Sequence, residues 1–141
     1  MKENGKRRED AAAASASSAL ACVLECLPGE RIMIISDSSR ADVADAFVKG
    51  ATSLGLWTRH YTFPQRKGVR KELPADLLEA MSAGGADIYI NLLEGPAAET
   101  PFRIKLIETE RHRRIRLGHC PGVTFDMLTE GALRLDPKGY G

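Results

Sequence analysis

Short apolar runs alternate with longer amphipathic segments along the chain. Runs that are almost continuously apolar predict buried strands at residues 31–36 and 87–93. Two further strands are predicted at residues 56–63 and 115–118. Apolar residues at helical spacing predict helices at about 10–27, 40–54, 74–81 and 100–113, and a short last helix that begins at Thr124. Because strands and helices alternate, right-handed crossovers predict an α/β fold, a Rossmann-like open parallel sheet of about four strands with helices on both faces.

A sheet of this kind in the strand order 2-1-3-4 has its switch point between the first strand and the strand at 87–93. Ligands of open α/β proteins bind at such a switch point, at the carboxyl ends of the strands. The loops that follow the predicted strands therefore line the candidate site. Its ligand-binding candidates are Asp37, Ser38, Glu94, Thr100, Arg103 and His119.

The turn after the first strand reads Ser36-Asp37-Ser38-Ser39-Arg40 and contains no glycine. Without the glycines of GxGxxG or P-loop motifs, a pyrophosphate cannot approach a helix N-terminus closely, which argues against a dinucleotide or a nucleoside triphosphate. Asp37 has two interpretations. It caps the following helix, or it is a ligand-binding or acid/base group; the cap alone already explains the residue.

A small-residue turn leads to a helix whose predicted N-cap is Thr100 and whose first helical residue is Pro101. Arg103 lies in the first turn, where a cation opposes the helix dipole, so we expect an acidic group beside it. One interpretation is an ion pair with Glu94 or Glu99. The other is the carboxylate or phosphate of a ligand, bound by Arg103 and the free N–H groups of that turn.

The composition is that of a soluble globular protein: 141 residues, 43% hydrophobic, 28% charged, with a net charge of +1. We expect a flexible tail at 1–9, one domain at 10–135 and a tail or linker at 136–141. The near-neutral charge argues against a nucleic-acid binder. No apolar segment approaches the roughly 20 residues that span a bilayer, and no signal-peptide core is present, so a cytoplasmic protein without membrane partners is expected.

Cysteine and histidine spacing gives no metal or disulfide signature. Cys22, Cys26 and Cys120 form an odd set without a CxxC pair, and the first two are expected to pack on one face of the first helix. The histidines form no HExxH motif. His119 beside Cys120 suggests a thiol nucleophile, but no third group orients them. A basic run in the loop after the second strand is expected to be solvated: Arg66, Lys67, Arg70 and Lys71.

Two longer motifs carry a resemblance. The first reads Asn-Leu-Leu-Glu-Gly-Pro-Ala-Ala-Glu-Thr-Pro-Phe-Arg-Ile-Lys-Leu-Ile, and the second reads Gly-His-Cys-Pro-Gly-Val-Thr-Phe-Asp-Met-Leu. They follow an apolar strand that ends in Asp and a basic loop that contains Pro. In this order they resemble the N-terminal domain of the aminopeptidase T type leucyl aminopeptidases, the thermophilic-type metallopeptidase family, particularly its archaeal members. The resemblance covers residues 13–135.

The resemblance implies an open α/β sheet in which the residues that match the family motifs are structural and cleft-facing: Thr100, Arg103, Pro121, Gly122, Thr124 and Met127. In that family the two-metal site, a set of Glu, His, Asp and Tyr ligands, belongs to a later catalytic domain. Some relatives are dioxygenases that act on a dihydroxypyridine ring. We therefore expect no catalytic residue, metal ligand or cofactor in this chain, which ends at Gly141, and Zn, Co or Mn only with that catalytic domain.

Two functions are expected from these features. The first is the N-terminal domain of a metalloaminopeptidase-like hydrolase, which removes N-terminal residues from peptides when joined to a two-metal catalytic domain. The alternative is a non-enzymatic α/β module that binds a small anionic ligand at the switch point through Arg103 and the Thr100 turn. A structural or dimerising domain would expose apolar surface. The expected partners are a catalytic domain or a second copy, and a peptide or small anionic ligand.

Overall fold

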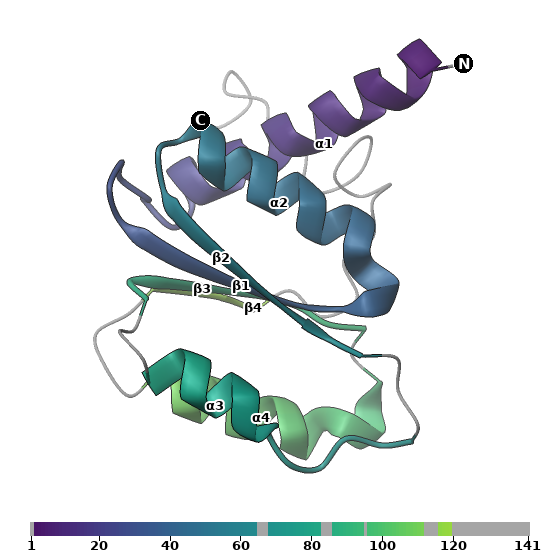
Figure 1. Cartoon of the computed structure of the whole chain (residues 1–141), viewed down its shortest axis with the longest axis vertical. Helices are drawn as coiled ribbons and strands as arrows, with labels where there is room; N and C mark the ends of the chain where they lie inside the picture. Colours follow the sequence, from purple (N-terminus) through teal and green to yellow (C-terminus); the bar gives the residue numbers. More distant parts are fainter. Residues whose placement is uncertain (1, 65–67, 83–85, 95, 112–115, 120–141) are drawn as a thin grey trace.

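A four-stranded parallel sheet lies at the centre of the structure, a computed structural model that describes residues 2–64, 68–82, 86–94, 96–111 and 116–119 (Figure 1). Its strands are β1 (Arg31–Asp37), β2 (Trp57–Phe63), β3 (Ile88–Leu92) and β4 (Arg116–His119). Their order is β2-β1-β3-β4, and every neighbouring pair is parallel. The predicted α/β sheet, its strand order and its switch point between β1 and β3 are confirmed.

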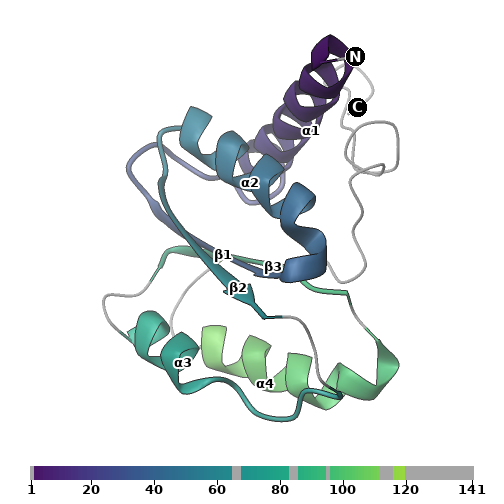
Figure 2. The ribbon, with the colours of Figure 1, turned by 45° about the vertical axis from the view of Figure 1, so that its right-hand side comes forward.

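Two helices cover each face of the sheet, as Figures 1 and 2 show from two directions. On one face lie α1 (Lys2–Cys22) and α2 (Ala41–Ser53), and on the other lie α3 (Ala75–Ser82) and α4 (Thr100–Glu110). The short 3₁₀ helices η1 (Ser38–Arg40) and η2 (Ala97–Glu99) come directly before α2 and α4. Among the helices that the structure describes, none is both long enough and apolar enough to cross a membrane.

Successive residues of each strand point to opposite faces, which explains why the apolar runs are nearly continuous. Ile32 and Ile34 of β1 enter the core that α1 and α2 cover, whereas Met33 and Ile35 enter the core that α3 and α4 cover. All four side chains are buried. A strand that is covered on both faces needs a buried residue at almost every position, and β1 and β3 have this pattern.

Small residues bring α1 and α2 into close contact. Ala12, Ala16 and Leu20 follow one another at helical spacing along α1 and have no exposed surface. Gly50 of α2 lies directly against α1, since a Cβ atom at this position would be only 2.8 Å from the backbone nitrogen of Ser17. A larger residue at position 50 would therefore push the two helices apart.

The first helix differs from its prediction at both ends. It begins at Lys2 and not at Asp10, so it includes residues for which the sequence pattern predicts a tail. Lys, Arg and Glu have high helix propensity, and they extend the helix without an apolar stripe. The helix ends at Cys22, so Cys26 lies beyond it, and Cys22 is exposed whereas Cys26 is buried. The expectation that both cysteines share one helix face is therefore wrong.

Candidate functional site

The carboxyl ends of β1 and β3 meet at the switch point, and Asp37 joins them. Asp37 is the last residue of β1 and is only 3% exposed. Its Oδ2 atom accepts a hydrogen bond of 2.7 Å from the backbone N–H of Glu94, just beyond β3. The side chain makes no capping hydrogen bond to the helical turn that follows, so the predicted role as a helix cap is wrong. Asp37 bridges two strands because their parallel register brings the strand ends together.

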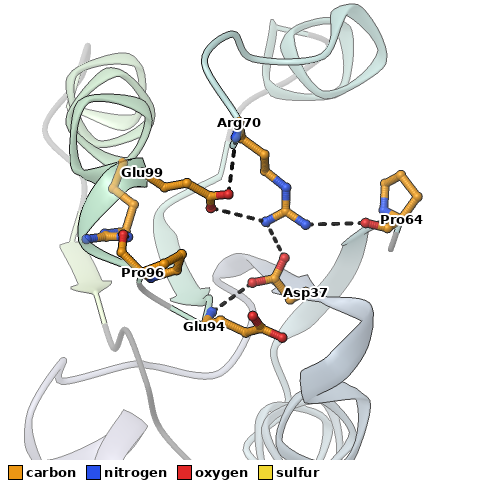
Figure 3. Close-up of polar contacts among 7 residues, drawn as sticks. Asp37, Pro64, Arg70, Glu94, Pro96 and Glu99 are labelled. Atoms are coloured by element: carbon orange, nitrogen blue, oxygen red, sulfur yellow. Dashed lines mark hydrogen bonds and ion pairs between the residues drawn. The ribbon is translucent and has the colours of Figure 1, made fainter. Parts of the chain in front are cut away.

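A guanidinium group from the loop between β2 and α3 reaches into the same place (Figure 3). Arg70 forms an ion pair with Asp37 Oδ1, and its Nη1 atom lies 3.9 Å from Glu99 Oε1. The backbone N–H of Arg70 donates to Glu99 Oε2 at 3.1 Å, and its Nη2 donates to the Pro64 carbonyl at 3.3 Å. The guanidinium carbon also lies 4.7 Å from the ring centroid of Phe63. We call Asp37, Arg70 and Glu99 the switch-point cluster.

The prediction that Arg70 belongs to a solvated basic loop is wrong. Its side chain is 13% exposed, and the carboxylates of Asp37 and Glu99 are buried almost completely. A buried carboxylate is costly unless a cation and hydrogen bonds compensate it, and Arg70 supplies both. The neighbouring Lys71 is exposed, so the charge run alone does not distinguish the two residues. The sequence therefore contains no local signal that singles out Arg70.

The switch-point cluster has more negative than positive charge. It contains two carboxylates and one guanidinium, two negative charges against one positive, which gives a formal net charge of −1. Glu94 lies at the same edge and is partly exposed. Negative charge at a partly desolvated edge attracts cations and repels anions. The cluster by itself therefore favours a ligand with a positive group over a phosphate or carboxylate, although the guanidinium groups of Arg40 and Arg103 at the same edge oppose this effect.

The start of α4 differs from its prediction in how Arg103 is held. The helix begins at Thr100, with Glu99 as the N-cap residue but without a side-chain capping bond. Arg103 donates from Nη1 to the Pro96 carbonyl at 2.8 Å and from Nη2 to Thr100 Oγ1 at 3.0 Å. Among the described residues no ion pair joins Arg103 to Glu94 or Glu99, so that expectation is wrong. Neutral oxygen atoms hold the guanidinium, because the nearest carboxylate in sequence is already bound to Arg70.

The other predicted site residues are not brought into this cluster by any described contact. Ser38 is exposed in η1. His119 is the last residue of β4 and is the register partner of Asn91 on β3, and its side chain lies outside the described part. Several motif positions also lie outside the described residues: Cys120, Pro121, Gly122, Thr124 and Met127. The structure thus joins Asp37 to Glu94 and Thr100 to Arg103, as two separate pairs.

Two polar pairs, one buried and one partly buried, cannot be predicted from the sequence because each joins residues from different elements. Asn91 Nδ2 donates to Glu110 Oε1 at 2.7 Å, and burial raises the pKa of Glu110 to about 8, against the lowering effect of this hydrogen bond. Ser36 Oγ lies 2.7 Å from His60 Nε2. Burial lowers the pKa of His60. Ser36 has no exposed surface, so this pair presents no accessible nucleophile.

Among the described residues, no candidate metal site lies at the switch-point cluster, and the cavity of the structure lies elsewhere. Within the described ranges, no group of three or more His, Cys, Asp or Glu side chains could hold a metal ion. A cavity of about 290 Å³ lies between α1 and α2, and it is lined by Gly5, Arg8, Glu9, Asp42, Asp45, Ala46 and Lys49. These residues share no member with the cluster, so the cavity is a separate feature of the helical layer.

Neither a protein-family model nor a curated protein matches the chain. The resemblance to the metalloaminopeptidase family therefore rests on the sequence motifs alone.

Proposed function

We propose that this chain is the N-terminal domain of a metalloaminopeptidase-like protein, and that its switch-point edge attracts the ammonium group of a peptide substrate. The observation that supports this choice is the negative formal charge of the switch-point cluster. Asp37 and Glu99 are too deeply buried to touch a ligand, so they act through their electric field. The Asp37 hydrogen bond fixes the backbone of Glu94, and the partly exposed side chain of Glu94 brings a further carboxylate to this edge.

Hydrolysis of a peptide needs groups beyond this cluster. In the family that the motifs resemble, the attacking water is activated between two metal ions held by a later domain. We propose the same division of roles here, in which residues of this chain orient the N-terminal end of the peptide. An orienting role requires rigid support. The buried contacts of Asp37 with Arg70 and with the Glu94 backbone supply it, because they tie together the ends of two strands and one loop.

The alternative, a module that binds a small anion, depends on Arg103 as the receptor. Two guanidinium nitrogens of Arg103 already donate to oxygen atoms of Pro96 and Thr100. An anion would have to replace these contacts or approach the remaining N–H groups, close to a cluster that is itself negative. The contacts at the start of α4 thus favour a local structural role for Arg103.

The two functions differ in the charge of the ligand, and NMR titrations of the full chain separate them. L-leucinamide carries an ammonium group, N-acetyl-L-leucinamide has the same side chain without that group, and inorganic phosphate is a simple anion. We expect leucinamide alone to shift the backbone amide resonances of Asp37, Glu94 and Glu99. The acetylated compound tests whether the ammonium group, and not the leucine side chain, is what binds.

Two variants complete this experiment. Glu94→Gln should weaken the response to leucinamide because it removes a carboxylate from the edge. Arg103→Ala should leave that response unchanged. A response to phosphate that disappears in Arg103→Ala, with no response to leucinamide, would establish the anion-binding module and reject the ammonium site.

Assays of peptide hydrolysis test the division of roles. The chain is incubated with leucine p-nitroanilide and Zn, Co or Mn salts, and release of p-nitroaniline is followed by absorbance. We expect no release above that of the metal salts alone. Metal-dependent release by this chain would place a complete catalytic site within it and would contradict the assignment of the metal ligands to another domain.

A further inference from the structure

β2 forms one outer edge of the sheet (Figure 2). All 7 of its residues pair with β1 on one side, and no segment that the structure describes pairs with it on the other. Most of the strand is exposed or partly exposed, and its first residue, Trp57, is 71% exposed. An uncovered edge of this length is a template on which another strand can pair.

The hydrogen bonds to β1 show which backbone groups of β2 point outward. The N–H of Trp57 donates to the carbonyl of Glu30, 2.9 Å away on the β1 side. Because the backbone groups of successive residues point to opposite sides of a strand, the odd-numbered residues of β2 bond to β1. The N–H and C=O groups of Thr58, His60 and Thr62 therefore point away from the sheet.

We propose that this edge pairs with the β2 edge of a second copy in an antiparallel arrangement whose two-fold axis passes through His60. Thr58 of each copy then lies opposite Thr62 of the other, and the two His60 residues lie opposite each other. Opposite residues whose backbone groups face each other exchange two hydrogen bonds, so every outward group of the edge gains a partner. The two four-stranded sheets become one continuous sheet. This inference is independent of the proposed function.

The side chains of β2 are complementary in this register. Arg59 comes opposite Tyr61 of the second copy, where a cation meets an aromatic ring, and Trp57 comes opposite Phe63. An axis one residue earlier would place the two Arg59 guanidinium groups opposite each other, which is unfavourable. An axis closer to either end of the strand would pair fewer residues. The register centred on residue 60 uses the whole strand and brings no like charges together.

His60, the residue at the two-fold axis, also allows the two copies to approach each other closely. The imidazole of His60 is held against its own sheet by Ser36 Oγ, 2.7 Å from Nε2. Burial lowers the pKa of His60, and the weaker effect of Asp45 on α2 raises it. Two neutral imidazoles at neutral pH do not repel each other across the axis.

Analytical ultracentrifugation and amide hydrogen exchange of the full chain test this pairing. We expect a monomer–dimer equilibrium in which exchange of the Thr58, His60 and Thr62 amides slows as protein concentration rises. The amides of the odd-numbered residues bond to β1 at every concentration and serve as internal controls. A chain that stays monomeric, a dimer in which the three outward amides exchange fast, or protection that does not depend on concentration would each overturn the proposal.

Two double variants test the register. Thr58→Lys with Thr62→Lys places lysine opposite lysine twice, which should raise the dimer dissociation constant about tenfold. Thr58→Lys with Thr62→Glu places lysine opposite glutamate at the same positions, and the dimer should persist. Positions 58 and 62 of the same strand are too far apart for their side chains to form an ion pair. The two variants therefore perturb the monomer similarly. Equal dissociation constants for two variants with wild-type circular dichroism would refute this register.

Discussion

Replacing Glu110 with glutamine should stabilise the protein at and above neutral pH. Glu110 is the last residue of α4 and is 2% exposed. Its Oε1 atom accepts a hydrogen bond from Asn91, whereas Oε2 is buried and has no hydrogen-bond partner among the described residues. The negative end of the helix dipole adds to the cost of a charge at this position. The folded protein therefore favours the neutral acid.

The size of the effect follows from the pKa. Burial raises the pKa of Glu110 from 4.5 to about 8, although the hydrogen bond from Asn91 lowers it. At pH values between 4.5 and about 8, the Glu110 side chain keeps its proton in the folded state and has released it in the unfolded state. The free energy of unfolding therefore falls as pH rises, by up to about 1.4 kcal/mol per pH unit, and levels off above the folded-state pKa. We expect a total loss of about 2 to 5 kcal/mol, which the Glu110→Gln variant should not show.

Chemical denaturation measures this difference, with far-ultraviolet circular dichroism as the signal, because the tryptophan of the chain, Trp57, is already 71% exposed in the folded state. The wild type and Glu110→Gln should have similar free energies of unfolding at about pH 5 and should diverge toward about pH 8.5, with the variant the more stable. Glu108→Gln changes an exposed glutamate of the same helix and should follow the wild type. Parallel pH profiles for the wild type and Glu110→Gln would refute the reasoning.

Three other substitutions, with Lys71→Met as a control, test the packing and the buried charges. Arg70→Met leaves two buried carboxylates without their cation and should lower the free energy of unfolding in urea by about 3 to 5 kcal/mol. Lys71→Met changes the exposed neighbour and should cost less than about 0.5 kcal/mol; equal effects would contradict the burial of Arg70. Gly50→Ala should lower the free energy of unfolding by about 1 to 3 kcal/mol, because the new Cβ would lie 2.8 Å from the α1 backbone. An unchanged melting temperature would contradict that close contact. Phe102→Ala removes a ring whose centroid lies 5.5 Å from that of Phe63. It should lower the free energy of unfolding in urea by about 3 to 5 kcal/mol. A smaller loss would mean that neighbouring side chains fill the cavity.

Only part of the candidate site can be predicted from the sequence. Asp37 and Glu94 come directly after the predicted strands at 31–36 and 87–93, and parallel packing of these strands brings such positions together. Arg70 follows no such rule, because its place depends on the path of a loop between β2 and α3. The interpretation of Arg103 fails for a related reason. Glu99 is close to Arg103 in the sequence, but in the folded chain it binds Arg70.

The sequence by itself determined the alternation of strands and helices, the parallel sheet and the order β2-β1-β3-β4. These features depend on local periodicity and on the handedness of crossovers, which short segments encode. The tertiary structure alone decided which charged groups are buried and what they bind. Arg70 and Glu110 lie in polar or solvated patterns, yet they enter the interior because partners from other elements surround them there. Burial and pairing of a charge depend on several segments at once, and no local pattern contains that information.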